Sequence, residues 1–378
     1  MNRTLRCRRV LSWPVFSLIL WLAFSGCNAD YQPRAVGPTE VVTVVMDSTH
    51  WKGDLGTALK ENVAPYLSTL PAPERAFTLR QVQLNSERAF DNAKRMKNVV
   101  FVAPLSDTSS TANFLRQRLS EEAREAVLDG QSAVVPKPDL WRRDQRVYFV
   151  TAATTPDLID ALQRTGNQIR ETFHEAVLGH MNRDMFDRGR QPALEDSLMD
   201  AHGFAVNVQH DYYIATDTAN FVWLRRVVSA RSWRSLFVYY VEGGDPSMLS
   251  SEWIYATRDS LTQQYIQGSV AGFMKADYRR PLVTEETNFL DRFAYETYGL
   301  WHMVGDSENG ELLQYGGGGP FVNYTFYDQA SDRIYMIDGS VFAPGYDKLE
   351  FLRQMEVIAR TFRTEKDAQP PMTAQRTP

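Results

Sequence analysis

The chain has little cysteine and no long hydrophobic run beyond its first 24 residues. Only Cys7 and Cys27 occur among 378 residues. Both lie in the N-terminal segment, so the rest of the chain has no thiol for a disulfide, a redox centre or a thiolate metal site. No apolar run after Phe24 approaches the about 20 residues that a membrane-spanning helix needs. Beyond this point the sequence therefore predicts a protein without disulfides and without a transmembrane helix.

The first 26 residues have the pattern of a bacterial lipoprotein signal peptide. Four arginines precede an apolar stretch at 10–24, and the small residues Ser25 and Gly26 then lead to Cys27. A positive segment, a short apolar segment and small residues are the parts of a cleavable signal. We expect removal of residues 1–26 and lipidation of Cys27, which makes the membrane a partner. An ordinary secretory signal with an incidental cysteine is the alternative.

Basic residues are in the minority. The chain has 41 Lys and Arg against 46 Asp and Glu, and loss of residues 1–26 leaves 37 against 46, a net charge of −9. An acidic surface repels nucleic acid and anionic lipid headgroups, so we expect no nucleic-acid partner. A mature chain of this length can bury a large core and can form two domains.

The pattern of polar and apolar residues predicts a tether followed by a first lobe. Residues 27–39 are polar and contain prolines, which is typical of a tether. Residues 40–193 alternate strand-like and helix-like segments, which predicts an α/β lobe. The apolar run at 40–47 predicts a buried strand, and residues 111–129 predict one helix. TTPD at 154–157 predicts a helix start with Thr155 as its cap.

Residues 194–364 predict an α+β lobe that is more antiparallel. A helix should end at Gly203, and two strands at 321–328 and 333–344 should form a hairpin. Asp347 and Glu350 form a capping-box pattern at the start of the last helix. Residues 365–378 are predicted to be a disordered tail. The fold class is thus α/β to α+β, with two packed lobes that are each a sheet covered by helices.

The motifs that suggest chemistry do not match their templates. His174 and His180 are six residues apart, whereas a zinc helix needs a spacing of four. The glycines at 316–319 precede a proline and a strand, so a flexible approach to a hairpin, or close packing of backbone, is favoured over phosphate binding. The acidic loop at 305–311 departs from the calcium-loop pattern, and GSVAG at 268–272 has its serine in the wrong place for a nucleophile elbow. We predict no metal, no cofactor and no catalytic residue.

One surface patch is a candidate for binding. Asp47 follows a buried strand, where α/β sheets often place functional groups, and Trp51 and Lys52 follow closely. Trp301 belongs to the aromatic-rich second lobe. We predict Asp47, Trp51, Lys52 and Trp301 as a possible binding patch. The alternatives are that Asp47 caps the next turn and that the aromatic residues form the core.

Seven segments, spread over nearly the whole mature chain, carry a family resemblance. They are EVVTVVMDSTHWKGDLG (40–56), NFVWLRR (220–226), ATRDSL (256–261), YGLWHMVGD (298–306), GGPFVNYTFYD (318–328), GSVFAPGYDK (339–348) and LRQMEVI (352–358). Together they resemble an uncharacterised family of lipid-anchored proteins from Bacteroidota-type bacteria, known only as a domain of unknown function. The resemblance implies a location and a fold, but no activity and no site residues.

Three functional hypotheses remain open. The leading one is a non-catalytic envelope lipoprotein that binds a protein or glycan partner. The alternative is a hydrolase of envelope polymers that uses carboxylates at the lobe interface, and the third is a spacer between membrane and wall. A cleft with paired carboxylates of raised pKa would favour the hydrolase, and a flat aromatic patch would favour binding. Because Asn28 follows the cysteine in place of aspartate, we expect the periplasmic face of the outer membrane.

Overall fold

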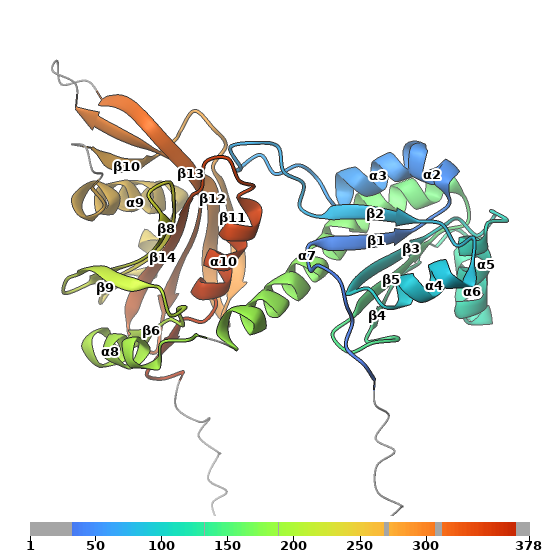
Figure 1. Cartoon of the computed structure of the whole chain (residues 1–378), viewed down its shortest axis with the longest axis horizontal. Helices are drawn as coiled ribbons and strands as arrows, with labels where there is room; N and C mark the ends of the chain where they lie inside the picture. The colour runs from blue at the N-terminus through green and yellow to red at the C-terminus, as the bar shows by residue number, and fades with distance from the viewer. Residues whose placement is uncertain (1–31, 132, 188, 268–271, 307–311, 368–378) are drawn as a thin grey trace, which may run out of the picture.

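The computed structural model describes residues 32–131, 133–187, 189–267, 272–306 and 312–367. It confirms the predicted fold class, because two lobes follow one another along the chain and each is a sheet with helices against it (Figure 1). The signal peptide, Cys27, most of the acidic loop at 305–311, most of GSVAG and residues 368–378 lie outside the described residues. No helix in the described ranges is long and apolar enough to cross a membrane.

The first lobe is built on a five-stranded sheet in the order β2-β1-β3-β5-β4. Strands β2, β1, β3 and β5 run parallel, and β4 pairs antiparallel with β5. Side chains alternate between two covered faces, which is why the central strands read as continuous apolar runs. The bounds are β1 (Val41–Val45), β2 (Thr78–Val82), β3 (Asn98–Val102), β4 (Ala133–Pro138) and β5 (Arg146–Thr151).

Helices cover both faces of this sheet. The core of one face includes residues of α3 and α7, and the core of the other face includes residues of α4, α5 and α6. The bounds are α2 (Ser48–Lys52), α3 (Asp54–Asn62), α4 (Glu87–Lys94), α5 (Ser110–Arg118), α6 (Glu121–Leu128) and α7 (Thr155–Phe186). Helix α7 is 32 residues long and extends from the first lobe to the second (Figure 1).

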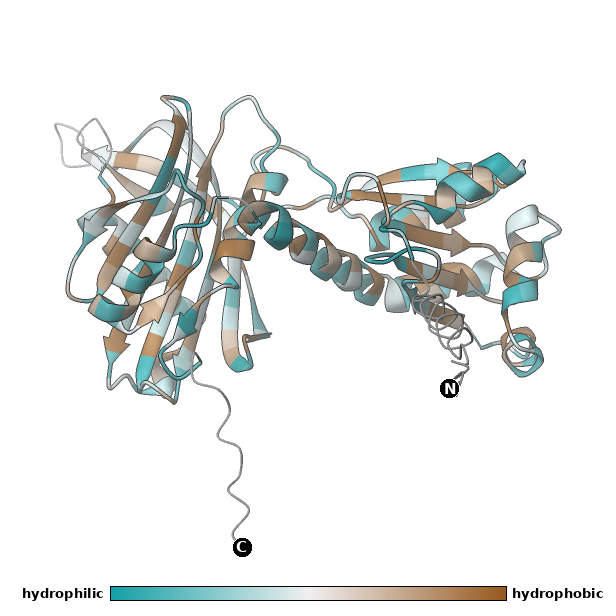
Figure 2. Ribbon diagram, turned by 60° about the horizontal axis from the view of Figure 1, so that its bottom comes forward, coloured by the Kyte–Doolittle hydropathy of each residue, from teal (hydrophilic) through white to brown (hydrophobic). Residues whose placement is uncertain are grey.

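The second lobe contains an eight-stranded antiparallel sheet. Its order is β10-β12-β13-β14-β9-β8-β7, with β11 also paired to β12. The predicted hairpin is formed by β13 and β14. Figure 2 shows hydrophobic residues concentrated along the strands of both lobes. The bounds are β7 (Tyr213–Asp217), β8 (Phe221–Ser229), β9 (Ser232–Glu242), β10 (Phe273–Ala276), β11 (Val283–Phe289), β12 (Arg292–Asp306), β13 (Leu312–Asp328) and β14 (Arg333–Phe342).

The helices of the second lobe cover opposite faces of this sheet. Helix α10 (Leu349–Ala359) packs on one face, where Gly339 leaves room for Met355, and α9 (Ser251–Tyr265) packs on the other. Helix α8 (Pro192–His202) ends at Gly203, whose φ of 73° is left-handed, as predicted. A short 3-10 turn (Pro246–Met248) precedes α9, and β6 (Phe204–Ala205) pairs with β15 (Arg363–Thr364).

The two lobes contact each other through α7, α10 and the segment between α3 and β2. This segment reaches across to the second lobe (Figure 1). There Glu74 accepts hydrogen bonds from the amides of Lys348 at 2.8 Å and Leu349 at 3.0 Å. Arg353 of α10 donates to the carbonyl oxygen of Ala76 at 2.7 Å. One hydrophobic cluster therefore continues from the first lobe into the second.

Several local predictions were wrong. The helix predicted over 111–129 is divided into α5 and α6, because Leu119 is extended and Ser120 caps a new helix. The cap of α7 is Thr154, which forms a capping box with Asp157. The capping box predicted for the last helix does not form, because α10 has no side-chain cap of its own and Glu74 occupies that place.

Two terminal segments pack more closely than expected. In the segment predicted as a tether, the amide of Ala35 donates to the carbonyl oxygen of Arg143 at 3.0 Å. In the segment predicted as a disordered tail, Asp367 forms an ion pair with Arg292 at 2.7 Å. The described parts of both segments are therefore attached to the lobes.

Candidate functional site

The structure brings three of the four predicted patch residues together. Asp47 is the N-cap of α2 and accepts from the amide of Thr49 at 2.8 Å, so the alternative that it caps the next turn is correct. Trp51 and exposed Lys52 lie on the same short helix, and Lys60 Nζ lies 4.1 Å from the Trp51 ring centroid. These residues belong to the carboxyl edge of the first sheet.

Trp301 lies elsewhere. It is on β12 of the second lobe, is only 2% exposed and stacks on Trp233 with ring centroids 5.3 Å apart. Because α2 and β12 belong to different lobes (Figure 1), the four residues do not form one patch. Trp301 and Trp233 line a separate cavity in the second lobe.

One polar candidate site is a cavity of ≈ 630 Å³ between the lobes, which we call the inter-lobe cleft. Domain interfaces are common locations of ligand sites. The first lobe contributes α7 and the segment after α3, and the second contributes β11, β12 and α10. Its ionisable lining residues are Arg170, Glu171, His174, Glu175, Glu285, Glu286, Glu296, Arg353, Glu356 and Arg360.

Two carboxylates of the inter-lobe cleft have pKa values displaced in opposite directions. Burial, reinforced by the charge of Glu356, raises the pKa of Glu296 above its usual range, although the hydroxyl of Tyr298 donates to Glu296 Oε1 at 3.0 Å. Burial alone would also raise the pKa of Glu356, but the charges of His174 and Arg353 lower it. The environment thus makes Glu296 harder to ionise, and Glu356 easier to ionise, than an ordinary glutamate.

Glu356 is held by side chains from both lobes. His174 Nε2 of α7 lies 2.8 Å from Glu356 Oε2. One turn further along α10, Arg360 donates to both oxygens of Glu175, at 2.8 and 2.9 Å. Buried donors near this pair are nevertheless incompletely satisfied, since Arg353 Nε and Arg360 Nε have no hydrogen-bond partner among the described residues. Such unsatisfied groups are common at functional sites.

Among the described residues of the inter-lobe cleft, a larger share of the cations than of the acids takes part in ion pairs. Arg360 pairs with Glu175, and Arg170 lies 3.4 Å from Glu171. Glu285 and Glu286 on β11 are exposed and form no ion pair in the described part of the chain. The open part of the cleft therefore favours hydroxyl-rich or cationic ligands over anions.

Metal binding finds no support in the part of the chain that the structure describes, where no group of three His, Cys, Asp or Glu could hold an ion. His174 contacts Glu356, whereas His180 Nε2 lies 3.2 Å from the carbonyl oxygen of Asp144. His174 and His180 thus have different neighbours, as expected for two histidines that are six rather than four residues apart. The glycines at 316–319 belong to β13. A Cβ on Gly318 would lie 2.7 Å from the carbonyl oxygen of Trp301, and one on Gly319 would lie 1.9 Å from that of Val341, which confirms the close-packing interpretation for these two glycines.

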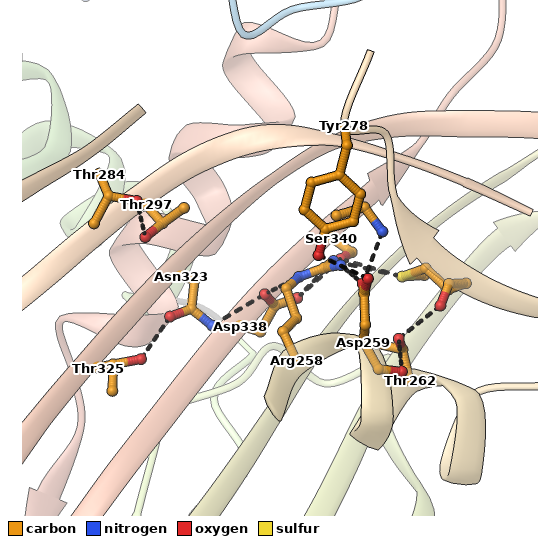
Figure 3. Close-up of polar contacts among 12 residues, drawn as sticks. Arg258, Asp259, Thr262, Tyr278, Thr284, Thr297, Asn323, Thr325, Asp338 and Ser340 are labelled. Atoms are coloured by element: carbon orange, nitrogen blue, oxygen red, sulfur yellow. Dashed lines mark hydrogen bonds and ion pairs between the residues drawn. The ribbon is translucent and has the colours of Figure 1, made fainter. Parts of the chain in front are cut away.

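A buried polar network beneath α9 is shown in Figure 3. Arg258 Nε donates to Asp338 Oδ2 at 2.7 Å, and both side chains are 1% exposed. Asn323 and Ser340 donate to the same carboxylate at 3.2 and 3.1 Å. Because the carboxylate is satisfied within the protein and closed to solvent, we interpret this network as the anchor of α9 on the sheet.

Comparison with protein families assigns both lobes. Residues 35–186 match "Domain of unknown function (DUF8532)" and residues 191–361 match "Domain of unknown function (DUF4837)". The chain therefore contains two domains of unknown function, one ending with α7 and the next beginning just before α8. The prediction of an uncharacterised domain is confirmed, and the matched regions cover most of the chain.

Solved structures give only weak similarities. The chain is similar to the Saccharomyces cerevisiae Ran-binding protein Mog1p at 11% identity and a TM-score of 0.28, over 43% of this chain and 90% of that one. A Mog1 point mutant gives 12% and 0.27 over the same shares, and a Bacteroides thetaiotaomicron structure gives 10% and 0.21, over 44% and 47%. These TM-scores are too low to support an argument. No curated protein matches.

The sequence interpretation missed both carboxylates of the inter-lobe cleft. Glu356 lies between Met355 and Val357 on the buried part of α10, and a carboxylate among apolar helix positions was the available signal. Glu296 had no such signal, because Glu356, whose charge raises its pKa, is 60 residues further along the chain.

Proposed function

We propose that this protein is a lipid-anchored cell-envelope protein that binds a glycan in the inter-lobe cleft. The observation that carries the proposal is the cleft itself, ≈ 630 Å³ in volume, with exposed acids on β11 and uncharged polar side chains such as Asn167 and Asn288 in its lining. Hydroxyl and amide groups of a sugar polymer match such a lining. At its rim Tyr66 is 59% exposed, with the Arg75 guanidinium 4.0 Å from its ring centroid, and so offers an aromatic surface for a sugar ring.

Binding is tested with purified envelope glycan fragments and isothermal titration calorimetry. Tyr66→Ala should weaken binding about two- to tenfold, because a stacking contact is lost. Tyr213→Ala is the matched control, since Tyr213 is also exposed but lies outside the inter-lobe cleft. Equal effects of the two substitutions would contradict a glycan site at Tyr66. Absence of any binding would favour the spacer hypothesis.

Hydrolysis of the bound polymer is the second candidate, and the opposed pKa shifts of Glu296 and Glu356 favour it. Protonated Glu296 would donate to the leaving oxygen, while ionised Glu356 would stabilise positive charge or activate water. Release of reducing ends from envelope glycans by the wild-type protein, abolished by Glu296→Gln without loss of binding, would establish catalysis. Undiminished binding with no release in either protein would leave the binding function alone.

Attachment at Cys27 and a position on the periplasmic face of the outer membrane are parts of the same proposal. Gln32 donates to the carbonyl oxygen of Asp139, so the chain joins the first lobe five residues after Cys27. Five extended residues span at most about 18 Å, which would hold the first lobe close to the lipid. Membrane fractionation of Cys27→Ser tests this, because the variant should leave the membrane pellet, and unchanged sedimentation would contradict lipid anchoring.

A further inference from the structure

A second cavity, of ≈ 560 Å³, lies within the second lobe, away from the inter-lobe cleft, and we call it the tryptophan pocket. Its wall is formed by Trp223 of β8, Trp233 of β9, Trp301 of β12 and Phe342 of β14. Met274 of β10 closes one side. The volume is within the range of sites for small organic ligands, about 300–1,000 Å³.

Glycines create the space of the tryptophan pocket. Gly316 and Gly317 of β13 line it, and a Cβ on Gly317 would lie 3.6 Å from Met303 Cγ and 3.8 Å from Phe342 Cε2, two side chains that also line the pocket. A strand that carried ordinary side chains here would project atoms into this space. The glycine run noted in the sequence therefore leaves a hollow beside aromatic rings.

The walls of the pocket contain hydrogen-bond donors without acceptors. Within the described residues, the indole Nε1 atoms of Trp223 and Trp301 and the Nε atom of Arg225 are buried and make no hydrogen bond. Trp223 is 7% exposed and Trp301 only 2%. Leaving a buried donor unpaired costs about 1–3 kcal/mol, so a ligand with acceptor oxygens would satisfy groups that the protein leaves open.

The charge of the tryptophan pocket is opposite to that of the whole chain. Arg225 is the one charged side chain among its described lining residues, and no ion pair of Arg225 occurs in the described part of the chain. Its guanidinium lies 4.7 Å from the Trp223 ring centroid and 5.7 Å from that of Trp233. Arg225 therefore places a positive charge beside apolar walls, in a protein whose formal net charge is −5.

We propose that the tryptophan pocket binds a single-chain amphiphile with an anionic head group, either a carboxylate or a phosphate. The head group would pair with Arg225, and the apolar chain would lie against the indole rings. Val227, which lines the mouth and is 47% exposed, extends the apolar surface outward along the chain of the ligand. This site is independent of the glycan proposal, because it shares no lining residue with the inter-lobe cleft.

The experiment uses ω-bromoundecanoate as the probe, because bromine quenches tryptophan fluorescence at short range. The protein is the full chain carrying Cys27→Ser, which retains every described residue and avoids detergent that would compete for the pocket. Saturable quenching is expected, with the uncharged methyl ester binding about tenfold more weakly, since it cannot pair with Arg225. Competition by a lysophosphatidic acid and by a fatty acid then distinguishes phosphate from carboxylate sources.

Two variants decide the assignment. Arg225→Gln should lower the affinity for the acid to that for the ester, whereas Arg231→Gln, on the turn that joins the same two strands but outside the pocket, should leave it unchanged. Non-saturable quenching, equal affinity for acid and ester in the wild type, or an unchanged affinity in Arg225→Gln would overturn the proposal.

Discussion

The buried ion pair between Arg258 and Asp338 gives the sharpest stability prediction. Both side chains are closed to solvent, and the guanidinium donates from Nε at 2.7 Å and from Nη2 at 3.3 Å. Asp338→Ala removes the acceptor and leaves a buried guanidinium without its counter-charge. Breaking a buried pair in this way costs about 3–5 kcal/mol. For a domain of this size we expect the melting temperature to fall by about 6–20 °C.

Urea unfolding followed by circular dichroism measures the loss. The control is Glu121→Ala, which breaks an ion pair with Arg124 in which Glu121 is 68% exposed, and which should cost less than about 1 kcal/mol. Adding Arg258→Met to Asp338→Ala should restore much of the stability, because no charge then remains buried. If Asp338→Ala costs no more than Glu121→Ala, or if the double variant shows purely additive losses, the network of Figure 3 does not anchor α9 as we infer.

Three further predictions concern packing, pH and capping. Gly339→Ala would place a Cβ 2.4 Å from the Cβ of Met355 and should lower the free energy of unfolding by about 1–3 kcal/mol. Gly179→Ala on α7 has nothing within 4 Å of its new Cβ and should raise the free energy of unfolding by up to about 1 kcal/mol. Thermal melts distinguish the two variants. Because burial raises the folded-state pKa of Glu296, its ionisation destabilises the fold, so the stability of Glu296→Gln relative to wild type should increase as pH rises above the ordinary glutamate pKa of about 4.3. Urea titrations measure this difference, and a pH-independent difference would refute the raised pKa. Glu74→Ala should cost about 1 kcal/mol, since two amides at the start of α10 lose their acceptor, whereas Glu74→Gln should cost less in the same titrations.

Features that depend on neighbouring residues along the chain were predicted well from the sequence. The end of α8 at Gly203 and the β13–β14 hairpin follow from local backbone preferences and alternation. The buried strands β1 and β3 follow from their apolar runs. The errors of one residue, such as Thr155 for Thr154 as a cap, arise where two adjacent residues have the same capping ability.

Features that depend on distant residues could not be predicted in the same way. Asp347 and Glu350 have the spacing of a capping box, but a carboxylate from the other lobe competes for the same amides and occupies them. The pair of Glu296 and Glu356, like the meeting of Trp233 with Trp301, is created by strand order and helix packing. The sequence identified Trp301, which lines the tryptophan pocket, but grouped it with three residues that belong to the other lobe.

The hydrogen bonds of Glu74 have a consequence for the order in which the protein folds. They join positions 274 and 275 residues apart, and α10 also takes Ala76 and His174 from the first domain as partners. Because the chain is synthesised from its N-terminus, the first domain can fold before the residues of α10 are available. The folded surface of the first domain can then serve as a template for α10. The two domains matched by family models are therefore not independent in this structure, and we expect residues 191–361 expressed alone to fold slowly and in low yield.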